Sequence, residues 1–103
     1  MSFADQAAKA AAVAFSRLGR PASYIPRDSV TAIPVTAVLR RSIEREQAGG
    51  DPYLVDEVTV QASEVPQIAR GDIFEIDGER WLVDAPARNT GYILSALVVP
   101  DIP

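Results

Sequence analysis

The stretch that decides the fold is residues 73–83, which read IFEIDGERWLV. The pair Asp77 and Gly78 lies between two runs in which apolar and polar side chains alternate. Asp-Gly is a preferred pair for a two-residue type I′ turn, because both positions of this turn need a positive φ. The stretch therefore predicts a β-hairpin.

A two-residue turn also fixes which residues face each other across the hairpin. We expect Phe74 to lie opposite Trp81 as an aromatic pair on one face. On the other face we expect Glu75 to lie opposite Arg80 as an ion pair. Each such cross-strand pair contributes roughly 0.2–1 kcal/mol to stability, so both faces favour the same register.

The period of two continues on both sides of the hairpin and indicates further short strands. We expect strands over residues 22–25, 33–39, 53–63 and 92–99, with a turn at residues 89–91 before the last of them. Apolar and polar side chains alternate along residues 53–63. We expect Val58, Val60 and Ala62 on one face and Glu57, Thr59 and Gln61 on the other. The last strand is apolar on both faces, as expected for a central strand. Residues 65–70 are expected to form at most a short turn of helix.

The amino-terminal segment has a helical period instead. Apolar side chains recur at steps of four and form one stripe, at Phe3, Ala7, Ala11 and Phe15. The pattern predicts a helix over residues 2–18, with Ser2 as its cap and with Gly19 and Pro21 as its stop. This narrow stripe suits packing on the protein's own sheet or contact with a neighbouring subunit.

Together these elements predict a single domain over residues 1–103 that is mainly β. We expect one helix over residues 1–19 and a small antiparallel β-barrel or sandwich of six to seven strands over residues 22–100, with a mobile loop over residues 46–53. With 48% hydrophobic and 23% charged residues, the composition is that of an ordinary globular domain with one core.

The composition argues against an enzyme. Cysteine and histidine are both absent, which removes thiol nucleophiles, the usual zinc ligands and the commonest general base. The neighbouring carboxylates Asp56 and Glu57 are interpreted as solvated side chains on alternating faces. We therefore expect no catalytic residue, no metal and no cofactor. There is no long apolar run and no signal-like start, so we expect a soluble protein without a membrane segment.

The charge argues against a protein that grips nucleic acid. The net charge is -4 and the pI is about 4.6, whereas affinity for DNA depends on Lys and Arg that neutralise phosphates. The basic residues are nearly all arginine, which pairs with carboxylates at interfaces better than lysine does. An oligonucleotide-binding barrel would also need exposed aromatics beside basic residues on one sheet face, and no such strand is present.

The second half of the chain carries a resemblance. Its residues are Tyr53-Leu54-Val55 with Asp56-Glu57-Val58, then Pro66-Gln67-Ile68-Ala69-Arg70-Gly71-Asp72, then the hairpin Ile76-Asp77-Gly78-Glu79-Arg80-Trp81-Leu82-Val83. In order and spacing these motifs resemble the head-tail joining proteins of lambda-like phages, and the resemblance spans nearly the whole chain. The loop over residues 46–52 is shorter than in some relatives.

The resemblance implies a structural protein of the virion, assembled in the host cytoplasm. It implies a ring of identical subunits, monomeric when free, between the portal or adaptor ring of the DNA-filled head and the tail terminator or tail tube proteins. DNA passes through the channel of such a ring without specific binding. One hypothesis is that acidic side chains line this channel and repel the phosphates.

For partner contacts we expect a group of residues around the loop, where guanidinium groups stand beside a flexible segment: Arg40, Arg41, Arg45, Gly49, Gly50 and Tyr53. An alternative function is a small β-barrel interaction module of another phage or secretion-like assembly, such as a tail-completion or baseplate component. It predicts the same fold, so genomic position would separate the two.

Overall fold

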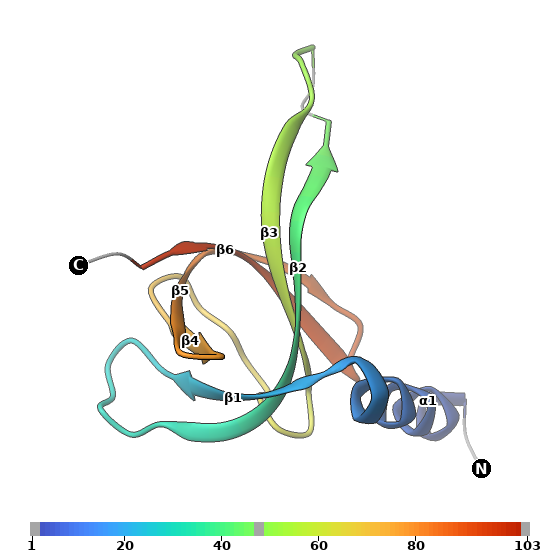
Figure 1. Ribbon diagram of the computed structural model, residues 1–103. Helices are drawn as coiled ribbons and strands as arrows, with labels where there is room; N and C mark the ends of the chain where they lie inside the picture. Colours follow the sequence, from blue (N-terminus) through green and yellow to red (C-terminus); the bar gives the residue numbers. More distant parts are fainter. Residues whose placement is uncertain (1–2, 47–48, 102–103) are drawn as a thin grey trace.

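A computed structural model describes residues 3–46 and 49–101. The chain forms one helix and six strands: α1 (Phe3–Leu18), β1 (Arg20–Ile25), β2 (Ile33–Arg45), β3 (Tyr53–Gln61), β4 (Ile73–Ile76), β5 (Glu79–Asn89) and β6 (Ile93–Pro100). The strands close into an antiparallel barrel in the order β1-β2-β3-β6-β5-β4 (Figure 1). The predicted fold class, a mainly β barrel with one amino-terminal helix, is confirmed.

The hairpin has the predicted turn. Asp77 and Gly78 have φ of 52° and 81°, as a two-residue turn with positive φ at both positions requires. The register pairs of β4 and β5 are the predicted ones, including Phe74 with Trp81. The geometry of this turn depends on its two central residues, so the local sequence was enough to predict it.

The side-chain partners on the hairpin differ from the prediction. Arg80 pairs through Nε with Asp101 at 3.3 Å, so the predicted ion pair with Glu75 is wrong. The reason is the closure of the barrel: the N–H of Asp101 donates to the carbonyl oxygen of Arg80 at 2.9 Å and brings the carboxylate alongside. The ring contact of Phe74 is likewise with Tyr24, its register partner on β1, at 5.2 Å between centroids.

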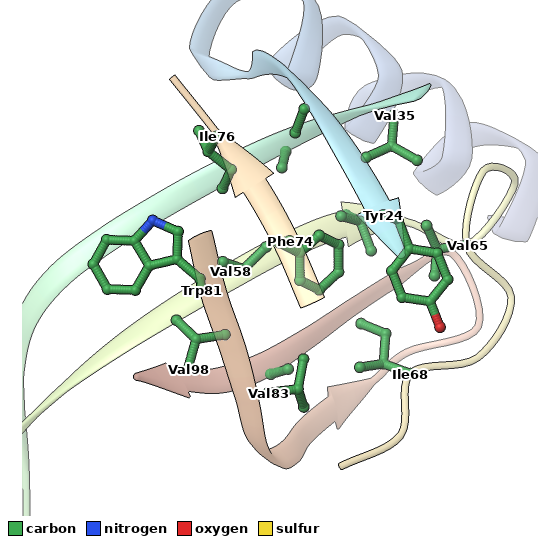
Figure 2. Close-up of a cluster of buried hydrophobic side chains, with 14 of the residues drawn as sticks. Tyr24, Val35, Val58, Val65, Ile68, Phe74, Ile76, Trp81, Val83 and Val98 are labelled. Carbon is green, nitrogen blue, oxygen red and sulfur yellow. The ribbon is translucent and has the colours of Figure 1, made fainter. Parts of the chain in front are cut away.

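The hydrophobic core fills the barrel. Figure 2 shows Trp81 and Tyr24 at opposite ends of this core, with Phe74 between them. Trp81 and Phe74 are among the largest fully buried side chains. Valine supplies much of the remaining packing, from β2, β3, β5 and β6, as the alternation along these strands predicts.

Strand β2 is longer than predicted. It continues beyond residue 39 to Arg45 and includes the arginines that were expected to lie beside a flexible segment. Beyond the barrel, residues 43–45 of β2 pair with residues 53–55 of β3 and form a two-stranded arm that projects from the body (Figure 1). Ser42 lies at the base of this arm with φ of 57°, and its N–H donates to Oδ1 of Asp56 at 2.9 Å. Backbone pairing with β3 therefore holds the charged end of β2 in a strand.

The segment between β3 and β4 has no helix and is fixed by a buried carboxylate. Asp72 is 2% exposed. Its carboxylate accepts hydrogen bonds from the Tyr24 hydroxyl at 2.6 Å, the Ala69 N–H at 2.8 Å and the Arg27 N–H at 3.0 Å. One aspartate thus ties three parts of the chain together at this end of the barrel.

This cluster predicts a dependence of stability on high pH. Burial, and then the hydrogen bond to and the negative charge of Asp72, raise the pKa of Tyr24 above its ordinary value of about 10. The folded state therefore favours the neutral hydroxyl. Its stabilisation is complete below pH 10 and declines above it, by up to about 1.4 kcal/mol per pH unit. Urea unfolding at several pH values measures this slope.

The matched control for the pH experiment is Tyr24→Phe. This variant lacks the Tyr24 hydroxyl and keeps every other ionisable side chain. We expect its free energy of unfolding to fall less steeply above pH 10 than that of the unchanged protein. Equal slopes would contradict the prediction.

Helix α1 is mostly exposed. Phe15 is buried, and the helix contacts β2 and β3, but Val13 and Leu18 are 54% and 70% exposed. Of the predicted stripe, only Phe15 lies among side chains that the structure describes, and the proposed cap Ser2 lies outside the described residues. The helix thus packs on its own sheet near its carboxyl-terminal end, and the rest projects from the barrel (Figure 1).

Candidate functional site

The predicted interface arginines lie on β2 and not in a turn. The guanidinium carbon of Arg41 lies over the Trp81 ring, 5.2 Å from its centroid. Arg40 and Arg45 are on the outer face. The structure therefore separates one predicted residue from the other two.

A β-bulge explains why Arg40 and Arg45 share a face. Arg40 lies opposite Glu57 and Ile43 lies opposite Val55, so β2 has one residue more than β3 between these pairs. An extra residue reverses the alternation of the side chains that follow. Without the bulge, residues five positions apart would point to opposite faces.

Glu57 is the residue on which these arginines converge. Its side chain is 9% exposed, and Oε2 accepts a hydrogen bond from Nη2 of Arg45 at 2.7 Å. Nη1 of Arg40 lies 4.0 Å from Oε1. The prediction that Glu57 is a solvated side chain is wrong, because its face is covered by the guanidinium groups and by the neighbouring strand. The register of Arg40 opposite Glu57 is the signal that could have indicated the pair.

A hollow of about 220 Å³ lies beside Glu57. Its lining comes from β2, β3, β5 and β6: Arg45, Tyr53, Glu57, Ala87, Arg88, Ser95 and Leu97. Two of the predicted interface residues, Arg45 and Tyr53, therefore meet here. Arg88 was not predicted. It also borders a second hollow under the last turns of α1 and a third beside residues 66–68.

We name the region where the first two hollows meet the arginine basin. Glu57, Arg88 and Ser95 line both hollows, Arg45 lines the first and Arg40 lines the second. Three positive charges face one negative charge there, on a chain whose net charge is -4. Among the described residues, Arg88 forms no ion pair, and the buried Nε of Arg45 has no hydrogen-bond acceptor. The basin can therefore accept a further carboxylate or another anion.

The remaining predicted residues lie on or beyond the arm. Gly49 has φ of 71°, and Gly49 and Gly50 are exposed. Gln47 and Ala48, within the loop predicted to be mobile, lie outside the described residues. At the base of the loop, Tyr53 and Leu54 are 42% and 67% exposed. The arm thus presents apolar surface next to the basin.

Two other kinds of site are absent from the described residues. Residues 3–46 and 49–101 contain no cluster of three or more acidic, His or Cys side chains that could hold a metal ion. Within these residues, no helix has the length and apolar character needed to cross a membrane.

Comparison with known proteins gave one family. The family model described as Phage Head-Tail Attachment protein matches residues 2–98. No curated protein matches the chain significantly. The family match covers the helix, the arm, the hairpin and every residue of the arginine basin.

Proposed function

The chain belongs to the phage head-tail attachment family, and from this premise we propose that it acts as one subunit of a ring that connects the head to the tail. The role in head-tail joining is structural, and the protein is a virion component that interacts with head and tail components. The proposed partners are the portal or adaptor ring on one side and the tail terminator or tail tube proteins on the other. DNA passes through the ring without specific binding.

The observation that carries the proposal is the pair of projecting elements. The arm and α1 leave the barrel in different directions (Figure 1). Each exposes large apolar side chains, Tyr53 and Leu54 on the arm and Val13 and Leu18 on the helix. A connecting protein needs two separate surfaces, and exposed apolar side chains on projecting elements are suited to being buried by a partner.

A ring also explains how a small subunit could hold two particles together. Every copy offers the same contacts, and contacts that are weak singly become strong when many copies engage together. The free subunit can then remain a monomer until it docks. The acidic charge is proposed to help DNA slide through the channel, where like charges repel.

The test is joining of purified DNA-filled, tailless heads to purified tails, with joined particles counted by electron microscopy. We expect the protein to raise the number of joined particles, and Leu54→Asp to lower that number by at least about tenfold. The reason is that a charge placed in the contact of every copy is multiplied around the ring.

Val30→Asp is the matched control, because Val30 is 100% exposed and lies outside the arm. We expect it to fold and to join particles nearly as well as the unchanged protein. Equal losses in the two variants would show that the arm has no special role. Failure of the unchanged protein to join particles would refute the proposed function itself.

A further inference from the structure

The arginine basin has three positive charges, and Glu57 is the one acidic residue among the described residues that line it. Glu57 accepts the hydrogen bond from Arg45 and lies 4.0 Å from Arg40. Arg88 borders the same two hollows as Glu57 and has no ion pair among the described residues. A planar guanidinium with free donors is suited to bidentate binding of a carboxylate.

A carboxylate without a partner lies on the far side of the barrel. In the strand order β1-β2-β3-β6-β5-β4, the wall that carries the basin is centred on β3 and β6, and the wall three positions away is β4 with β1. Glu75 lies on β4 and is exposed. Its register partners are Ser23 on β1 and Arg80 on β5, and Arg80 pairs with Asp101 instead. No ion pair reaches Glu75 within the described residues.

We propose that Glu75 of one copy binds Arg88 in the arginine basin of the next copy, and that this contact closes the ring. The inference rests on the proposed function, since it names the surfaces that join the ring's subunits. Arg88 is on β5, next to the β4 strand of Glu75, but eight residues beyond Arg80, the register partner of Glu75. The two groups therefore belong to different surface patches, so each copy gives a carboxylate at one patch and receives one at the other. Such a heterologous contact repeats around a ring, whereas an isologous contact would stop at a dimer.

A second copy is the occupant that the charges favour. The chain has an excess of acid overall, a local excess of base in the basin, and an unpaired acid on the opposite wall. The basin also has an apolar border, because Ala14, Phe15 and Leu18 line the hollow that Arg40 and Arg88 share. Burying this border against the next copy would exclude water from the ion pair and strengthen it.

Cross-linking tests the contact directly, because the chain has no cysteine and the introduced thiols are therefore its only ones. The double variant A87C/S23C keeps both Arg88 and Glu75. Ala87 is next to Arg88 and lines the same hollow, and Ser23 is the register partner of Glu75 on β1. We expect a bismaleimide to link successive copies in joined particles and to give a series of multimers on a denaturing gel. Within one copy the positions are far apart, because Ala87 is seven residues further along β5 than Arg80, the register partner of Glu75 on that strand.

The matched control is A87C/D84C, which also keeps Arg88 and Glu75. Asp84 is exposed on β5, the strand that carries Ala87, so this pair meets in adjacent copies only if like surfaces face each other. We expect no multimers from it. Multimers from A87C/D84C and none from A87C/S23C would overturn the proposed contact.

Charge exchange gives a second, functional measurement. We expect Arg88→Glu and Glu75→Arg each to lower the number of joined particles at least about tenfold, and the double variant R88E/E75R to restore most of the loss. If Arg88→Glu abolishes joining while Glu75→Arg has no effect, the basin binds an acidic group of another protein and the inference is overturned.

Failure of this inference can be distinguished from failure of the proposed function. If the unchanged protein joins heads to tails but A87C/S23C gives no multimers in joined particles, the contact is wrong and the proposed function stands. If the unchanged protein does not join particles, the proposed function is wrong. The same cross-link on concentrated purified protein then decides the contact, which multimers support and their absence refutes.

Discussion

Replacing Asp72 with alanine is expected to lower the free energy of unfolding by about 3–5 kcal/mol. The carboxylate is 2% exposed and accepts three hydrogen bonds, from the Tyr24 hydroxyl and from the N–H groups of Arg27 and Ala69. In the variant the N–H groups of Arg27 and Ala69 lose their acceptor, and the Tyr24 hydroxyl keeps only the more distant carbonyl oxygen of Gln67, at 3.1 Å. Each buried donor left without a partner costs about 1–3 kcal/mol. Urea unfolding near neutral pH measures the change.

Tyr24→Phe is the control for this experiment, because it removes one of the three donors and leaves the carboxylate. We expect a loss of about 1 kcal/mol, the usual net contribution of a hydrogen bond. If Asp72→Ala costs no more than Tyr24→Phe, the other two hydrogen bonds contribute nothing beyond the cost of burying the charge. That result would contradict the role of Asp72 as the tie between the segment before β4 and the barrel.

The second large effect is expected at Glu57. Glu57→Ala leaves Arg40 and Arg45 facing each other and Arg88 without a negative charge between them. Because Arg40 and Arg45 keep 62% and 42% of their side-chain surface exposed, water screens much of the loss. We therefore expect a loss of about 1–3 kcal/mol, below the usual cost of breaking a fully buried pair.

Hydrogen exchange locates the effect of this substitution. The amides of residues 43–45 and 53–55 should exchange faster in Glu57→Ala, because the ion pair with Arg45 fastens the base of the arm. Glu57→Gln keeps a side-chain acceptor and should have a smaller effect. Faster exchange spread evenly over the barrel would show that Glu57 stabilises the whole fold and not the arm.

The sequence predicted those features that short segments determine. The two-residue turn at Asp77 and Gly78 fixed the register of β4 and β5, and alternation identified Val58 and Val60 as core residues. The helix was equally local. These predictions hold because the geometry of a short turn and the period of a strand act within a few residues.

The site was predicted in part. Arg45 and Tyr53 line the hollow beside Glu57, and their role as interface residues stays a prediction. The places of Glu57 and Arg88 in this hollow were not predicted. The position of Glu57 beside both arginines depends on the register between β2 and β3 and on the bulge after Arg40. The loop that joins these strands is too long to fix this register. Arg88 follows another register shift on β5. Bulges alter which way a side chain points without a clear mark in the sequence.

Closure of the barrel has a consequence for the life of the free subunit. Within the closed part of the barrel each strand has a partner on both sides, so this part offers no open strand to which another chain could add by backbone hydrogen bonds. Open edges remain on the arm, at residues 43–45 and 53–55. A structural protein that accumulates in an infected cell before its partners are ready would otherwise risk growing into fibrils. Away from the arm, contacts between copies must then form through side chains, whose specific geometry can limit growth to a finite number of copies.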